Sequence, residues 1–486
     1  MKKALALALV LLTVSVGGMC AAVFMLRGQQ DRVEVTRLSE QGNPAVLDGL
    51  EVLLHSRASD SQMNWFTTYR PGQTHFVDTQ SAYKRFWDEE NRYDYLLGHL
   101  HGDEKARSMV LSHGYSMDYD AEEENPTGLD LAIHQIAEET KPGTQSTRTV
   151  SVRDYLPFYR ISASFRLPDV EGYVEGYVRG ENENWKELTA AEEAREEAIN
   201  QFFRIPVQES EKVTISVAKD GEGNVGRNYD LEFFDADSFD FYISSRDNVV
   251  TDDAFYFTFN NRNDQGEVVD TSLIPGGYGI YRLPYTMDFD PQKETGILTE
   301  QLATVYAVDS GHEILRLHSS HDKSRLLLHT LENGWYVLTV IDRESMTALQ
   351  RFEIQEKSPE KGSWKLWEDQ EQDIFMVEMD KSYAFFALQE DGTYAQVFLC
   401  QIPSQMQERS EWSDMAYDGK RLVVGDVYDR RDSTNTAQGV FCLSVYDFTG
   451  LRYWGEYDLS LNSKVQQDNY AGVRPDNITP IKLTWN

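Results

Sequence analysis

The sequence predicts an all-β protein built from one repeated unit of short antiparallel strands. Three observations support this prediction. Short runs of β-branched and aromatic residues, bounded by Gly, Asp or Asn, recur along the chain, as at 213–217, 255–259 and 337–341. A turn followed by an apolar run is repeated in the C-terminal half. Helix signals are confined to two short segments beyond the N-terminus.

Composition and charge exclude several classes of function. The chain has 486 residues, 41% of them hydrophobic, and a net charge of −34. Such a negative charge disfavours nucleic acid and anionic lipid surfaces, because both require concentrated Lys and Arg. Three cysteines can form neither a disulfide framework nor a four-cysteine zinc site.

The N-terminus predicts export to the cell membrane. Lys2 and Lys3 precede an uncharged apolar run, Ala4–Leu26, which Arg27 ends. At about 1.5 Å per residue a helix of this length spans about 34 Å, enough to cross a hydrocarbon core of about 30 Å. We therefore expect a cytoplasmic tail at 1–3, a single-pass membrane anchor at 4–26, a short linker at 27–31 and an extracytoplasmic domain at 32–486.

Two alternatives to the anchor remain open. Ala4–Val16 resembles the apolar core of a signal peptide, and Cys20, Ala21 and Ala22 offer small residues for cleavage, which would release a secreted protein. Cys20 is also a candidate for lipid modification. The apolar residues Val23–Leu26 extend the run to spanning length and favour the anchor.

Two hairpins and two helices are predicted before the repeat becomes clear. Leu50–Arg57 with Asn64–Tyr69, and Phe241–Asp247 with Ala254–Asn260, read as hairpins. One helix is expected at 129–140. A second, started by a capping box at Thr189–Glu192, is expected to run to Phe203. Both read as insertions near 129–140 and 190–203, either surface decoration or carriers of a binding surface.

A turn with a following strand recurs three times. His321–Leu328, Met379–Phe386 and Tyr417–Val424 share an Asp-containing turn and a run of apolar residues. Asp bonds its own backbone in such turns, and Gly accepts a positive φ. The runs that follow predict strands buried on both faces.

The next strand is also repeated. Gly334–Asp342 matches Gly439–Asp447 in residue type, and Gly279–Tyr281 is a candidate earlier copy. After Asp447, a turn leads to a further strand at 452–461. The unit is therefore four short strands joined by hairpins, with a period of roughly 40–60 residues, as in a propeller blade.

These residues resemble a known repeat family. His318–Leu327 and Tyr417–Val424 are similar to the first hairpin of WD40-like and TolB-like β-propeller repeats, over roughly residues 310–460. The resemblance implies a single closed β-propeller over 32–486, with about seven four-stranded antiparallel blades within a range of six to eight. Pairing of Val33–Leu38 with Ile478–Trp485 in one blade is expected to close the ring.

Metal-ligand patterns are weak. His99, His101 and Asp103, with His113 nearby, could face one ion from one side of a strand, but an ordinary polar strand face explains them equally. Other His and Asp residues also fall in groups, without the spacing of an EF-hand, and read as packing, turn or solvated residues. They are His312, His318, His321, His329 and the pairs Asp118/Asp120, Asp235/Asp237 and Asp288/Asp290.

No catalytic or cofactor motif is recognised. The glycine-rich stretch Gly276–Gly279 lacks the Lys and helix of a phosphate loop and predicts a turn into a strand. Cys400 and Cys442 are expected at similar places in consecutive blades, as buried inert thiols. The abundant aromatic residues suit either sheet packing or the stacking face of a glycan or protein site.

Two functions follow from these observations. The first is a membrane-anchored binding or scaffold module for a protein or glycan of the cell envelope. The alternative is an extracellular hydrolase of glycans or peptides with carboxylates in the propeller channel. Its signature would be two carboxylates about 5–10 Å apart, one of them partly desolvated.

Overall fold

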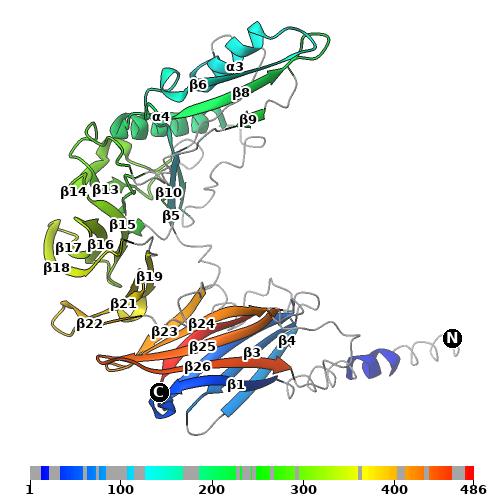
Figure 1. Ribbon diagram of the computed structural model, residues 1–486, viewed down its shortest axis with the longest axis vertical. Coiled ribbons are helices and arrows are strands. Elements are labelled where there is room, and N and C mark those ends of the chain that lie inside the picture. The colour runs from blue at the N-terminus through cyan, green and yellow to red at the C-terminus, as the bar shows by residue number, and fades with distance from the viewer. Residues whose placement is uncertain are drawn as a thin grey trace. The chain divides into compact units, whose positions relative to one another are not determined.

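The structure is a computed structural model. It describes residues 13–20, 33–58, 63–72, 76–83, 107–113, 126–167, 185–225, 230–232, 242–243, 248–262, 267–289, 295–359, 364–401, 411–431, 437–461 and 477–486. The chain divides into two compact units, which are described separately. Unit 1 combines Met1–Glu104 with Ser358–Asn486, and unit 2 is Lys105–Lys357. Element labels are those of Figure 1.

Unit 2 contains two sheets in which four consecutive strands pair antiparallel in chain order (Figure 1). The first consists of β11 (Asn248–Val250), β12 (Ala254–Phe257), β13 (Gly279–Pro284) and β14 (Ala303–Ala307), with the 3-10 helix η3 (Thr299–Gln301) before β14. The second consists of β15 (Glu313–Ser319), β16 (Arg325–Glu332), β17 (Trp335–Asp342) and β18 (Thr347–Glu356). This up-and-down order is that of a propeller blade.

The inner strands of these sheets form because their residues are apolar on both faces. In β17, the six residues Tyr336–Ile341 are all buried, and in β13 five of six residues are buried. Strands buried on both faces read as continuous apolar runs. The predicted strand at 334–342 and its earlier copy at 279–281 are confirmed as the third strands of their sheets.

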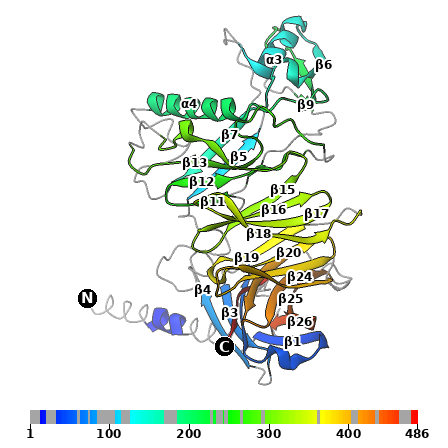
Figure 2. The same cartoon turned by 90° about the vertical axis from the view of Figure 1, so that its left-hand side faces the viewer.

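The rest of unit 2 consists of two small sheets with helices packed on them (Figure 2). Its first sheet has the order β10 (Tyr242–Ile243), β5 (Ser108–His113), β7 (Ile161–Arg166). Its second has the order β6 (Gln145–Ser151), β8 (Lys212–Ala218), β9 (Asp230–Glu232). Its helices are α3 (Gly128–Glu139), η2 (Val152–Asp154) and α4 (Trp185–Phe203).

Both predicted helices are present. α3 packs on β6 and β8, and α4 packs on β7, so each covers one face of a small sheet. The capping box at Thr189 is wrong, because α4 begins at Trp185 and Thr189 lies inside the helix. Lys186, Glu187 and Leu188 are good helix formers, and they extend the helix toward the N-terminus.

The described strands of unit 1 form three sheets. The first is β19 (Trp364–Asp369), β20 (Ile374–Met379), β21 (Ser382–Leu388) and β22 (Tyr394–Gln401), again in chain order, with η4 (Gln370–Gln372) after β19. The second has the order β1 (Val33–Gly42), β26 (Gly450–Leu461), β25 (Ala437–Asp447), β24 (Leu422–Arg431), β23 (Glu411–Tyr417). The third has the order β27 (Asn477–Trp485), β2 (Leu50–Ala58), β3 (Met63–Arg70), β4 (Phe76–Tyr83), and η1 (Pro44–Leu47) lies between β1 and β2.

The two ends of the chain exchange strands in unit 1. The predicted pairing of Val33–Leu38 with Ile478–Trp485 is wrong. Instead, β1 pairs with β26, with Val35 opposite Leu459, and β27 pairs with β2, with Leu483 opposite Val52. Each end therefore completes the sheet built by the other end. Two free strand edges are covered in this way, where the predicted pairing would have covered one.

The predicted hairpins are present with two shifts. Asp322 and Asp418 lie in turns between the first and second strands of their sheets, but Asp380 joins the second and third strands, β20 and β21. The hairpin predicted at 241–260 is formed by β11 and β12, because the earlier strand β10 pairs with β5. The hairpin of β2 and β3 is confirmed.

No helix of the described residues is long and apolar enough to cross a membrane. Of the predicted anchor 4–26, only residues 13–20 are described; they are helical and exposed. The blade number and the closure of one ring over 32–486 stay predictions.

Candidate functional site

The sheets β11–β14 and β15–β18 of unit 2 have several connecting segments at the same end. In such a sheet, the turn between the second and third strands and the exit from the fourth strand lie at the same end. We call this end of unit 2 the connector end, formed by residues 258–262, 267–278, 308–312 and 333–335. Propeller proteins place binding loops at such ends, because rigid strands hold the loops in place.

Hydrogen bonds fix the loop after β12 to the connection between β14 and β15. Asn261 is fully buried, and its Nδ2 donates to the backbone oxygen of Ser310 over 2.8 Å. The Nη2 of Arg262 donates to the backbone oxygen of Gly311 over 2.8 Å. Asn260 donates to the Glu313 carboxylate over 3.0 Å. These contacts join the two sheets of unit 2 at the connector end.

Tyr278 strengthens the same junction from within. Its ring is buried, its hydroxyl accepts the backbone N–H of Ile314 at 3.1 Å, and its carbonyl accepts the N–H of Val308 at 2.7 Å. Burial raises the pKa of this phenol, so it stays protonated at neutral pH. The glycines before it, Gly276 and Gly277, have φ of 78° and 88°, which confirms the predicted turn into β13.

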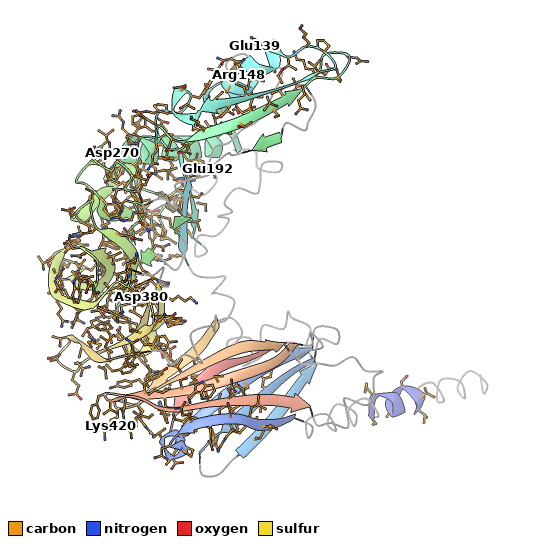
Figure 3. The ribbon with its side chains drawn as sticks, in the orientation of Figure 1. Glu139, Arg148, Glu192, Asp270, Asp380 and Lys420 are labelled. Atoms are coloured by element: carbon orange, nitrogen blue, oxygen red, sulfur yellow. The ribbon has the colours of Figure 1, made fainter. Side chains whose placement is uncertain are left out.

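Three large apolar side chains are exposed at the connector end. Trp335 has 40% of its surface exposed, Leu273 47% and Val268 45%. Trp335 follows a tight turn in which Asn333 and Gly334 have φ of 50° and 85°. Asn and Gly accept these values, and such turns join paired strands with little strain. Asp270, labelled in Figure 3, lies in the same loop as Leu273.

The connector end therefore offers a rigid surface for a macromolecular partner. The Gly334 oxygen accepts the N–H of Lys357 over 2.7 Å, so the turn that presents Trp335 is also fixed. Exposed tryptophan on a fixed backbone is the side chain most enriched at the centres of protein interfaces.

A second polar feature lies in unit 1, where β27 meets β23. The Oδ2 atom of Asp414 accepts the backbone N–H of Leu483 over 2.5 Å, and the Nε1 of Trp485 donates to the backbone oxygen of Ala416 over 3.1 Å. The Arg421 guanidinium lies 4.1 Å from the centre of the Trp485 ring. Burial, together with the negative charge of Asp369, raises the pKa of Asp414 to about 7.

The histidines near the β15–β16 hairpin pack in the core of unit 2. His318 and His329 are buried, and their Nε2 atoms lie 3.0 Å apart. Burial and the nearby Arg316 charge lower the pKa of His329 well below its usual value, so it is neutral. His321 is exposed in the turn, and His312 lies 3.7 Å from Glu332. These positions agree with packing and turn roles.

The other candidate metal ligands fall mostly outside the part of the chain that the structure describes. His99, His101 and Asp103 lie outside the described residues, as do Asp118/Asp120, Asp235/Asp237 and Asp290. Among the residues that the structure describes, no group of three or more His, Cys, Asp or Glu side chains could hold a metal ion.

The two cysteines predicted as buried do not occupy matching places, and only Cys442 is buried, whereas Cys400 is partly exposed. Cys400 lies in β22, the fourth strand of its sheet, whereas Cys442 lies in β25, which follows β24 and β23 as the third. The predicted equivalence is wrong, because apolar runs mark the third and fourth strands alike. Burial raises the pKa of the Cys400 thiol to about 12, which makes it unreactive at neutral pH.

Trp335 and Asn261 were not among the site residues predicted from the sequence. The dipeptide Asn333-Gly334 directly before an aromatic residue is a signal for a tight turn that presents that residue. No local signal identifies Asn261, whose role depends on a contact with Ser310, 49 positions along the chain.

Comparisons with known proteins add fold likenesses at low similarity. No family model and no curated protein matches the chain. A putative 6-phosphogluconolactonase from Bacteroides fragilis aligns over 91% of this chain and 100% of its own, with 9% identity and a TM-score of 0.31. The WD40 domain of SCAP from fission yeast aligns over 89% and 91%, with 6% identity and a TM-score of 0.25. A chain of the Mitotic Checkpoint Complex aligns over 41% of this chain and 46% of its own, with 14% identity and a TM-score of 0.23.

Similarity at this level carries no information on activity. The four-stranded antiparallel sheets themselves establish the propeller-type repeat, because consecutive strands pair in chain order in three of the described sheets. No specific family is assigned.

Proposed function

We propose that the chain is a binding module that holds a protein partner at the connector end of unit 2. The observation that supports this function is the exposed Trp335, presented by a tight turn beside segments fixed by Asn261 and Arg262. Interfaces gain most of their affinity from a few aromatic and Arg side chains on a preorganised backbone.

The proposed place of action is outside the cytoplasm, with the N-terminal segment as the anchor. The support for this is the sequence of Lys2, Lys3 and the apolar run Ala4–Leu26. A protein of the cell envelope is therefore the proposed partner.

A site-specific cross-link tests the proposed face. A photoreactive amino acid is placed at Trp335 of the full chain in cells, and a matched control is placed at Leu349. Leu349 is also exposed, at 52%, but it lies in β18, the outer strand of the same sheet. We expect a discrete cross-linked protein from position 335 and none from position 349. Equal products at both positions, or none at 335, would contradict the proposed face.

The affinity of the captured partner gives a second readout. Trp335→Ala should weaken binding about 30-fold, which corresponds to about 2 kcal/mol. Leu349→Ala should leave affinity unchanged. Because Trp335 is partly exposed, its replacement should leave the fold intact.

The hydrolase alternative is less well supported. Asp414 has the raised pKa expected of a desolvated acid, and Asp369 is the second carboxylate that acts on it. Both carboxylates, however, accept backbone N–H groups, Asp414 from Leu483 and Asp369 from Glu371 at 3.0 Å. Such bonds give each carboxylate a structural role, and we therefore place binding first.

A further inference from the structure

Trp335 lies between two glutamates on one face of its sheet. β16, β17 and β18 run side by side (Figure 2), and Trp335 on β17 is directly opposite Glu332 on β16 and Glu356 on β18. Residues directly opposite each other in antiparallel strands share a face, with Cβ atoms about 4.5–5.5 Å apart. The partly exposed indole of Trp335 therefore has a carboxylate neighbour on each side.

The first of these glutamates is already paired within the sheet. The Glu332 carboxylate accepts the Thr330 hydroxyl at 2.7 Å and the Arg351 guanidinium at 2.8 Å, and His312 lies 3.7 Å from it. Arg351 also donates to the Glu353 carboxylate over 2.7 Å. Two carboxylates therefore share one permanently charged guanidinium, and this part of the face has no spare arginine.

Glu356 is the glutamate that is open to a partner. It is exposed at the end of β18, and its side chain makes no ion pair or hydrogen bond with any residue that the structure describes. Lys357 continues the ladder, since its N–H donates to the Gly334 oxygen, and strand alternation assigns its side chain to the opposite face. Among the described residues, no cation lies over the Trp335 ring.

The exposed charges elsewhere at the connector end have the same sign. Glu267, Asp270 and Asp309 are exposed, whereas Arg262, the one arginine among the described residues of this end, is partly buried and lies 3.6 Å from Glu313. A positively charged partner is therefore attracted to this end, and a negatively charged one is repelled.

We propose that Trp335 and Glu356 receive an arginine side chain of the protein partner. Because this contact is part of the proposed binding face, it rests on the proposed function and specifies the chemistry of the partner there. A guanidinium is planar, stacks on an indole ring and pairs with a carboxylate through two parallel N–H donors. The lysine ammonium has no flat face, so arginine fits this combination of indole and carboxylate better.

Fluorine NMR of the full chain tests the contact with small probes. The tryptophans are replaced by a fluorinated tryptophan during expression, and Trp335→Phe identifies the Trp335 resonance. The probe is N-acetylarginine amide, and its matched control is N-acetylcitrulline amide, which has a similar planar group without the charge. We expect the arginine probe to shift the Trp335 resonance at concentrations about tenfold lower than the citrulline probe.

Two substitutions separate the local contact from the overall charge of the chain. Glu356→Gln should weaken the response of Trp335 to the arginine probe about threefold, because the carboxylate that pairs with the guanidinium is lost. Glu344→Gln removes the same charge in the turn between β17 and β18, at the other end of this sheet, and should leave the response unchanged. Both glutamates are exposed, so both variants should fold.

Three results would overturn the arginine contact. The first is a Trp335 resonance that the arginine probe does not move up to its solubility limit. The second is an equal response to the two probes, and the third is an equal effect of Glu356→Gln and Glu344→Gln. The cross-link from position 335 reports partner binding without reference to charge. A discrete cross-link together with any of these results would leave the binding face standing, whereas a missing cross-link together with the expected probe responses would contradict the binding face.

Discussion

The hydroxyl groups of Tyr453 and Tyr457 lie 2.7 Å apart in the core of unit 1, although both residues are fully buried. The two tyrosines lie on the same face of β26. The Tyr457 ring stacks on Phe441 at 5.0 Å, and Tyr69 from β3 meets it edge-on at 5.5 Å. Through the contact between Tyr457 and Tyr69, the tyrosine pair links the sheet β1-β26-β25-β24-β23 to the sheet β27-β2-β3-β4. We make two predictions about this pair.

The first prediction concerns the two hydroxyl groups. Tyr457→Phe should destabilise unit 1 by about 1–2 kcal/mol, because the Tyr453 hydroxyl loses a buried partner. Tyr453→Phe should have a similar effect. The double variant should cost less than the sum of the two, since no buried hydroxyl is then left without this bond. Urea unfolding followed by hydrogen exchange of β26 measures all three; strictly additive effects would be evidence against the pair.

The second prediction concerns the glycine between the two tyrosines. A Cβ atom at Gly455 would collide with the Tyr453 hydroxyl and lie 2.9 Å from its Cζ. Gly455→Ala should therefore destabilise unit 1 by about 1–3 kcal/mol, the usual cost of overpacking. Gly221→Ala is the control, because no atom lies within 4 Å of the added group. A change of less than about 0.5 kcal/mol at Gly455 would mean that the tyrosine is free to move.

The repeat was predictable because an inner strand is buried on both faces and therefore has an apolar run in its own local sequence. β17 is buried at Tyr336–Ile341 and β25 at Phe441–Tyr446, and these buried stretches are the mostly apolar runs that the sequence shows. The sequence of a turn does not indicate in the same way which two strands of the unit the turn joins. Asp380 and Asp322 stand in similar sequences, yet they lie between different strand pairs: the Asp322 carboxylate accepts the N–H of Ser324 in its own turn, whereas the Asp380 carboxylate accepts the N–H of the distant Ser358.

Contacts between distant residues were not predictable. The pairing of β1 with β26 and of β27 with β2 joins residues from opposite ends of the chain, and either pairing alone satisfies the same alternation of side chains. Asn261 reads as a loop residue, and its burial arises only when the connection at 308–312 folds over it. The candidate site is therefore a product of sheet-to-sheet packing.

The third prediction concerns how the stability provided by the turn between β15 and β16 depends on pH. The Asp322 carboxylate accepts the Ser320 hydroxyl at 2.7 Å and the N–H of Ser324 at 2.9 Å, and these bonds lower the pKa of Asp322 to about 2. A lowered pKa stabilises the folded state above the unfolded value of about 4, and this stability is lost as the pH falls through 2.

Asp322→Ala should therefore cost about 0.5–1 kcal/mol at pH 7, a modest value because solvent screens the exposed group. The difference from the wild type should shrink as the pH falls from about 4 to about 2. Equilibrium unfolding across this range measures it. Glu344→Ala, at an exposed residue in the turn between β17 and β18, is the control. A difference that stays constant down to about pH 2 would show that the carboxylate charge has no role.

The fourth prediction concerns the junction of the connector end. Asn261→Asp replaces the amide that donates to Ser310 with a buried carboxylate that cannot donate. Burial of an uncompensated charge should destabilise unit 2 by at least about 2 kcal/mol at pH 7. The loss should be smaller near pH 5, because a buried carboxylate takes up a proton and regains a donor. Hydrogen exchange of β12 and β15 at the two pH values measures this difference.

Asn333→Asp, at an exposed turn position with φ of 50°, is the control and should change stability by less than about 0.5 kcal/mol at either pH. Equal losses of stability from Asn261→Asp and Asn333→Asp would contradict the role of Asn261. If Asn261→Asp destabilises unit 2 strongly and also weakens the cross-link from position 335, the junction at Asn261 also positions the proposed binding face.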